Sequence, residues 1–160
     1  MTAADMPAVS ELSNRVHINY PERLEVLEEK FVLFPQGCFA LTDASAVIHG
    51  YCFSHPWTDD VAPSLDTFLI TLPEAPSNYF IHDLTLDPSV QGRNLAAGLL
   101  PCLLEAAAEI QVRRMALVAV NGSEPFWKRM GFVRTDDPSL QASARSKYDD
   151  DAVHMQRNLA

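Results

Sequence analysis

The segment from Tyr79 to Val120 constrains the fold more than any other part of the chain. It contains a strand pattern over 79–86, a short polar loop, an apolar helical pattern that starts at Leu95, and the continuously apolar run 115–120. A short run that is apolar throughout is typical of a strand buried on both faces. The segment therefore predicts a strand–helix–strand unit, and with it an α/β domain built on a mixed sheet.

The first strand of this unit should present its side chains on two opposite faces. Strict alternation along this strand places Phe80, His82, Leu84 and Leu86 on one face and Ile81, Asp83 and Thr85 on the opposite face. The side chains of His82 and Asp83 should then diverge.

Pro101 lies inside the helical pattern, so we expect it to remove a backbone donor and bend the helix near its second turn.

The rest of the sequence alternates between helix and strand patterns. Caps, prolines and apolar spacing predict helices near 5–16, 21–34 and 126–130. Apolar or alternating runs predict strands at 37–43, 45–55, 132–135 and 152–159. The proline-rich stretch 55–78 is expected to be a loop, and the acid-rich stretch 136–151 an exposed excursion. We expect residues 1–160 to form a single domain.

Composition argues against several classes of partner. The formal net charge of −9 disfavours nucleic acids and anionic membrane surfaces, because both attract basic proteins. The three cysteines are far apart and none has zinc-site spacing, and the run 149–151 of three aspartates lacks ligand spacing, so no metal is expected. No apolar run reaches the ~20 residues of a membrane span, and no signal peptide is recognisable. These features favour a soluble, cytoplasmic protein.

The loop "DPSVQGRNLAAGLL", from Asp87 to Leu100, connects a strand end to a helix start. Such a loop presents unpaired N–H groups and the positive end of the helix dipole, which together bind phosphate. An ordinary crossover loop would have the same general pattern. The glycine spacings of the P-loop and of dinucleotide-binding folds are absent, and so is the GxSxG motif of serine hydrolases.

Two motifs together carry a family resemblance. "LTLDPSVQGRNLAAGLL" resembles the acetyl-CoA loop of the GCN5-related N-acetyltransferases (the GNAT family), with Gln91, Asn94 and Ala96 at the three fixed positions of Gln/Arg-x-x-Gly-x-Gly/Ala. "LVAVNGSEPFWKRMGF" is similar to the second family signature, a strand, an Asn and a short helix that ends in Gly-Phe. The predicted hairpin "GCFAL…VIHGY" fits the second and third family strands. The resemblance covers nearly the whole chain in the correct order.

The resemblance implies a mixed, mostly antiparallel central sheet flanked by helices and splayed between the fourth and fifth family strands, with acetyl-CoA as co-substrate in the gap. It implies a cofactor site formed by three groups of residues. The first strand would offer main-chain groups of Leu84, Thr85 and Leu86. The loop would hold the pyrophosphate with the amides of Gln91, Gly92, Arg93, Asn94, Leu95, Ala96 and Ala97. The far wall would consist of Asn121, Phe126 and Trp127.

Two residues depart from the family pattern. Asn94 stands where the motif has its middle glycine, and Asn tolerates the left-handed backbone better than most residues. Trp127 stands where many members have a tyrosine that is thought to protonate the departing thiolate, and an indole N–H is no practical acid. Water, Tyr79 or Tyr148 could replace that tyrosine.

The resemblance implies acetyl transfer to a primary amine of a small molecule or protein, by direct attack in a ternary complex. The general base could be His82, Asp83 or a water chain. A catalytically weak acyl-CoA-binding sensor is the alternative. The acids Asp59, Asp60, Asp66 and Glu74 would give the acceptor entrance a negative charge and favour cationic amines.

The chain opens "MTAADMPAVSEL", which resembles the loop and helix that follow the first family strand, and no strand pattern precedes it. That strand is therefore expected to be missing, either because the sequence begins at an internal Met or because the protein lacks it. In the second case one edge of the sheet would be open, and a homodimer partner could cover it.

Overall fold

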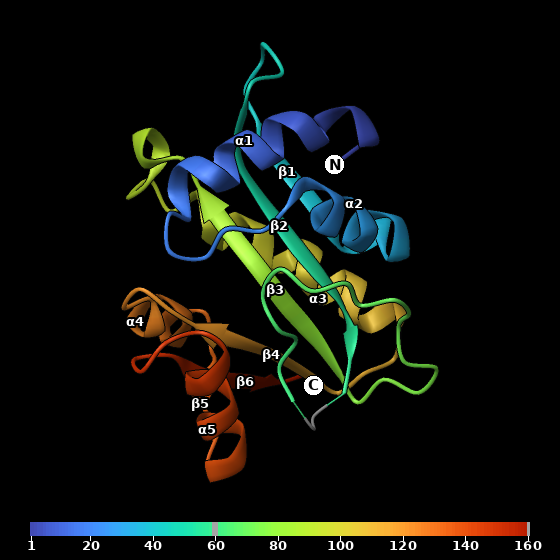
Figure 1. Ribbon diagram of the computed structural model, residues 1–160, viewed down its shortest axis with the longest axis vertical. Coiled ribbons are helices and arrows are strands. Elements are labelled where there is room, and N and C mark those ends of the chain that lie inside the picture. Colours follow the sequence, from blue (N-terminus) through green and yellow to red (C-terminus); the bar gives the residue numbers. More distant parts are fainter. Residues whose placement is uncertain (59–60, 160) are drawn as a thin grey trace.

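The computed structural model describes residues 1–58 and 61–159, which contain a six-stranded sheet with helices on both faces (Figure 1). The strand order is β1-β2-β3-β4-β6-β5, and every neighbouring pair is antiparallel except β3 and β4. The strands are β1 Cys38–Thr42, β2 Ile48–Trp57, β3 Asn78–Leu86, β4 Arg114–Ala119, β5 Val133–Arg134 and β6 Val153–Asn158. The expectation of a mixed, mostly antiparallel sheet is confirmed.

Five α-helices and four 3-10 segments surround the sheet in the described residues. The helices are α1 Met6–Val16, α2 Leu24–Leu33, α3 Leu100–Glu109, α4 Glu124–Arg129 and α5 Pro138–Lys147, and the 3-10 segments are η1 Ala3–Asp5, η2 Pro35–Gly37, η3 Pro88–Val90 and η4 Leu95–Leu99. Helices α1 and α2 cover one face and α3 the opposite face (Figure 1). In the described chain no helix is both long and apolar enough to span a bilayer.

Each face of the sheet has its own apolar core. Val9 and Leu12 of α1 pack with Leu27 of α2 on the aromatic rings of Tyr51 and Phe53. On the other face, a larger core joins α3 and α4 to the inner strands, and its members include Leu103, Ala107, Tyr79, Ile81, Leu117 and Trp127. The apolar positions of the sequence patterns therefore account for both helix layers.

A β-bulge in β3 corrects the predicted alternation. Phe53 of β2 pairs with Asp83 and the next residue, Ser54, pairs with Ile81, so His82 has no partner across the pair. The extra residue turns both His82 and Asp83 toward the α1–α2 side, where they contact the segment that joins these helices. Leu84 lies with Ile81 against the α3 core instead. The prediction that His82 and Asp83 diverge was therefore wrong.

Two further expectations about helices were also wrong. Pro101 bends no α-helix, because residues 95–99 form the 3-10 segment η4 and α3 begins only at Leu100. In the first turn of α3 the missing N–H of proline costs nothing. The stretch 136–151 is not wholly an exposed excursion, because it contains α5, whose Leu140 and Ala144 are buried.

β1 is one edge of the sheet, and among the described residues no strand precedes it. The amino group of Met1 donates to the Cys38 carbonyl of β1, 3.3 Å away. A partner chain along this edge stays a prediction.

We expect Gly37→Ala to destabilise the fold, because an added Cβ would lie 2.1 Å from the Ser54 carbonyl of β2. Overpacking of this kind costs about 1–3 kcal/mol of unfolding free energy. Gly98→Ala is the matched control, since nothing lies within 4 Å of its added Cβ. Urea unfolding of both variants measures the difference, and equal stability would contradict the close approach at Gly37.

Candidate active site

The site is an opening between β3 and β4. The two strands pair only from Tyr79 to Ile81 and from Met115 to Leu117, and beyond these residues they diverge. A cavity of about 560 Å³ occupies the opening. Its walls are the ends of both strands, the loop before η4, α4, and the segment that joins α1 to α2. Except for Arg93 and Ala97, all the residues predicted for the site line this cavity.

The loop before η4 has the backbone that phosphate binding requires. Gly92 and Asn94 both adopt positive φ, +76° and +58°, so Asn94 keeps the left-handed conformation at the glycine position of the motif. Within the described chain, the N–H groups from Gly92 to Ala96 donate no hydrogen bond, and they lie at the start of η4, whose first residues are Leu95 and Ala96. These unpaired donors at a helix start are suited to an anion. Gln91 stiffens the loop by donating from Nε2 to the Leu86 carbonyl, 3.0 Å away.

The opposite wall comes from β4 and α4. Asn121 turns the chain with a φ of +52°, and Ser123 and Pro125 begin α4. Phe126 and Trp127 meet edge to face with ring centroids 4.9 Å apart, and Phe132 supports the indole from behind at 5.4 Å. Trp127 is 7% exposed, so it is a buried wall of the cavity rather than a mobile group.

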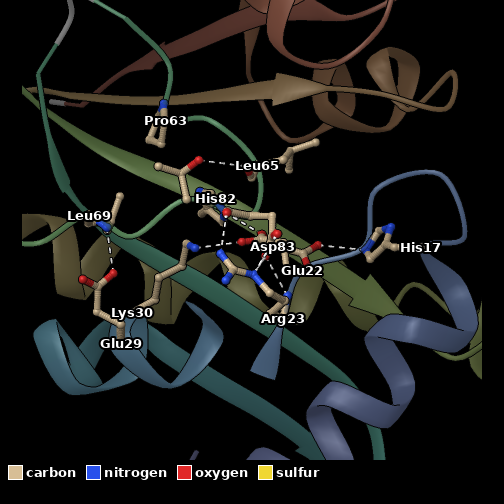
Figure 2. Close-up of polar contacts among 12 residues, drawn as sticks. His17, Glu22, Arg23, Glu29, Lys30, Pro63, Leu65, Leu69, His82 and Asp83 are labelled. Carbon is tan, nitrogen blue, oxygen red and sulfur yellow. Dashed lines mark hydrogen bonds and ion pairs between the residues drawn. The ribbon is translucent and has the colours of Figure 1, made fainter. Parts of the chain in front are cut away.

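Glu22 of the α1–α2 connection is a charged residue in the interior. Its carboxylate accepts from Lys30 Nζ and from His82 Nε2, each at 2.8 Å, and Figure 2 shows it between these two side chains. The side chains of Lys30, Glu22 and His82 are 1%, 4% and 0% exposed. Burial alone would raise the pKa of Glu22, but the charges and hydrogen bonds of His82 and Lys30 lower it to about 2. Glu22 is therefore ionised at neutral pH.

A second histidine–carboxylate pair lies beside the first (Figure 2). His17, the C-cap of α1, brings Nε2 to 3.1 Å from Asp83 Oδ1 and also contacts the Thr85 hydroxyl. Tyr51 donates to Asp83 Oδ2 at 2.6 Å. Burial would lower the pKa of His17, but the hydrogen bond and charge of Asp83 outweigh it and the net pKa is raised. Together the two pairs fasten the α1–α2 connection to the bulged strand.

His17 and Glu22 were not found from the sequence. They lie 66 and 60 residues away from their partners Asp83 and His82, and no local pattern links them. Of these four residues, only His82 and Asp83 lie in the strand pattern 79–86. The contacts depend on how α1 and α2 pack across the sheet, so the fold had to be known first.

The tyrosines considered as thiol acids differ in position. Tyr79 does not line the cavity: it is fully buried on the α3 side and its hydroxyl bonds Ser54 Oγ at 2.7 Å. Tyr148 does line the cavity, but its hydroxyl donates to the Pro63 carbonyl at 2.8 Å. Burial raises the pKa of Tyr148 well above its ordinary value. Of the two, Tyr148 alone lines the cavity.

Asp66 and Glu74, two of the four residues predicted to form an acidic entrance, do not line the cavity. Asp59 and Asp60 lie outside the described residues. Asp66 is held by Arg23, whose backbone N–H and Nε donate to its carboxylate at 2.8 to 3.0 Å, and neither Asp66 nor the exposed Glu74 lines the cavity. The acidic side chains that line the cavity in the described chain are Glu22 and Asp83.

Comparison with known proteins identifies the family. The family model described as "Acetyltransferase (GNAT) family" matches residues 7–132. The chain belongs to the GNAT family. No curated protein is similar to it by sequence.

GNAT structures share the fold over nearly their whole length. Ard1 from Thermoplasma volcanium superposes with a TM-score of 0.74 at 13% identity, covering 100% of this chain and 95% of that one. A GNAT-like decarboxylase, GphF, in complex with isobutyryl-CoA gives 0.75 at 16% identity, with 100% and 97% covered. Rv2747 from Mycobacterium tuberculosis, in complex with CoA, gives 0.70 at 16%, with 99% and 96% covered. At these identities the structural similarity shows a common fold alone, and the reaction has to be inferred from the site.

We expect Glu22→Gln to cost about 3–5 kcal/mol of unfolding free energy at pH 7, because it leaves Lys30 buried without its counter-charge. The pKa of Glu22 is lowered in the folded state, so its ionisation stabilises the fold above pH 4.5, and this contribution is lost as the pH falls toward 2. Urea unfolding from pH 7 to pH 2.5 should show the gap to the parent narrowing below pH 4.5.

Glu124→Gln is the control for this prediction, since Glu124 pairs with Lys128 and Arg134 at the surface. It should change stability by less than about 1 kcal/mol. A Glu22 variant as stable as the Glu124 variant at pH 7 would contradict the buried ion pair.

Proposed function

We propose that this GNAT protein is an acetyl-CoA-dependent N-acetyltransferase that acts on a primary amine of a small molecule or protein by direct attack in a ternary complex. The observation that carries the proposal is the cavity between the diverging strands, with the unpaired amides of 92–96 at one end and a fixed carboxylate, Asp83, in its wall. Most members of the family are N-acetyltransferases.

The cofactor would extend along the end of β3 beyond Ile81, where the strand has no β4 partner. The pyrophosphate would bind within the predicted loop 91–97, at the unpaired amides from Gly92 to Ala96, where the left-handed Asn94 shapes the backbone. Leu84, Thr85 and Leu86 pair with β2 but have no β4 partner. The main-chain groups on the β4 side would bind the pantetheine amides and the acetyl carbonyl, apart from the Leu86 carbonyl, which accepts from Gln91. Asn121, Phe126 and Trp127 would form the other wall. The solved neighbours that hold CoA or isobutyryl-CoA support an acyl-CoA in this fold.

Acyl transfer needs a neutral amine, and an amine with a pKa near 10.4 is about one part in a thousand neutral at pH 7. Of the two residues predicted as base, Asp83 is better placed, because its side chain is 15% exposed and that of His82 is 0% exposed. Asp83 would contact the acceptor nitrogen, and His82 would hold Glu22 in place. The CoA thiol, with a pKa of about 8.5, leaves readily as a thiolate, so Trp127 in place of a tyrosine is tolerable.

A non-catalytic acyl-CoA sensor is the second candidate, favoured by the same Trp127 and by Asn94 in the loop. Thiol release from acetyl-CoA, measured with a panel of primary amines, separates the two. Amine-dependent release supports the transferase. Tight acetyl-CoA binding with no release on any amine would support the sensor instead.

The loop assignment is tested by Asn94→Asp and Asn94→Gly. Both substitutions tolerate the left-handed backbone, but only Asp puts a carboxylate next to the pyrophosphate. We expect Asn94→Asp to weaken acetyl-CoA binding by about 10-fold or more, a difference of at least about 1.4 kcal/mol, and Asn94→Gly by less than about 3-fold. Calorimetric titration measures both, and equal affinities would contradict the pyrophosphate site.

A further inference from the structure

His17 is a titratable group in the cavity wall that neither motif includes. We propose that His17 is a positioning residue for the transfer, which takes up, through the Asp83 carboxylate, the proton that the acceptor ammonium must lose. The inference rests on the proposed function, because it concerns the amine end of the same cavity.

Hydrogen bonds hold the Asp83 carboxylate beside His17 in the cavity wall. Oδ1 of Asp83 lies 3.1 Å from His17 Nε2 and 3.0 Å from Thr85 Oγ1, which donates to it, and Oδ2 accepts from Tyr51 at 2.6 Å. The side chains of His17 and Asp83 are 16% and 15% exposed, so both are accessible from the cavity. A carboxylate held by three neighbours cannot rotate freely, and its distance to the imidazole is maintained.

The other polar side chains on this side of the cavity are unsuited to the task. Glu22 is saturated by Lys30 and His82 and is a very weak base, with a pKa of about 2. The His82 side chain is 0% exposed. The pKa of Tyr20 is raised to about 12 and that of Tyr148 is raised as well, so neither ionises near neutral pH. His17 is the cavity-lining histidine of the described chain whose side chain is accessible.

The surroundings of His17 suit a proton acceptor near neutral pH. The charged groups around it are Asp83 on β3 and Glu22 on its own segment, and Tyr51 of β2 reaches it through Asp83. Burial pulls the pKa down and the two carboxylates push it up, with a net result above 6.5. General bases are most effective when their pKa is near the working pH.

The acceptor binds as an ammonium beside Asp83, and one proton passes through the carboxylate to neutral His17, which becomes an imidazolium. The neutral amine then attacks the thioester carbonyl, the C–N bond forms, and the C–S bond breaks with its electron pair on sulfur. The second N–H proton of the tetrahedral intermediate passes to the thiolate, which gives free CoA, and His17 returns its proton to solvent.

The experiment compares pH profiles of kcat/KM for the parent, His17→Gln and His49→Gln. Gln at position 17 can still donate to Asp83 and Thr85 but cannot titrate. We expect kcat to fall at least 10-fold, the acidic limb near the His17 pKa to disappear, and the KM for acetyl-CoA to stay within 2-fold. His49 makes a similar ion pair, 3.0 Å to Asp43, away from the cavity, so His49→Gln should leave the profile unchanged.

A second measurement is independent of activity and of the stability of the His17 variant. Imidazole NMR of the full chain should show that His17 titrates above pH 6.5 and that Asp83→Asn lowers its pKa. An acidic limb that persists in His17→Gln, or a His17 pKa that Asp83→Asn leaves unchanged, would overturn the inference while the transferase proposal stands. Absence of transfer by the parent chain on every amine would overturn both.

Discussion

The carboxylate of Glu22 is buried against the sheet, and a charge in that position is stable only while Lys30 and His82 share it. Because His82 is the extra residue of the β3 bulge, the same interaction holds the bulge against the α1–α2 connection. The bulge in turn directs Asp83 toward α1, where His17 meets it. One buried ion pair therefore determines the shape of the strand, the position of the neighbouring carboxylate and one wall of the cavity.

The two ends of the cavity are built in different ways. At the loop end the cavity is lined by backbone: positive φ at Gly92 and Asn94 exposes amides, and the Gln91 side chain stiffens the loop. At the α1–α2 end it is lined by side chains, the paired acids and histidines. This division suits a protein in which one ligand is constant and the other is specific. A cofactor common to a whole family can be bound by backbone, whereas an acceptor must be recognised by side chains.

The sequence predicted the sheet and the backbone conformation of the loop before η4 because both depend on local patterns. The apolar run 115–120 and the spacing of Gln91, Asn94 and Ala96 are visible without any structure. The bulge at His82 was missed because the one-residue register shift against β2 leaves no mark in the residue types of β3, which still read as an ordinary strand. The 3-10 segment before Pro101 was missed because its apolar spacing continues that of α3. His17 and Glu22 were missed because packing alone brings them to their partners.

The two histidine–carboxylate pairs are arranged reciprocally: the α1–α2 connection contributes His17 and Glu22, and β3 contributes Asp83 and His82. The α1–α2 connection therefore fits only a strand that carries a carboxylate opposite His17 and a histidine opposite Glu22. An attempt to change acceptor preference by grafting the α1–α2 connection of another GNAT protein would leave two unmatched groups under the sheet. The connection and residues 82–83 form one module for engineering, although about 60 residues of chain separate them.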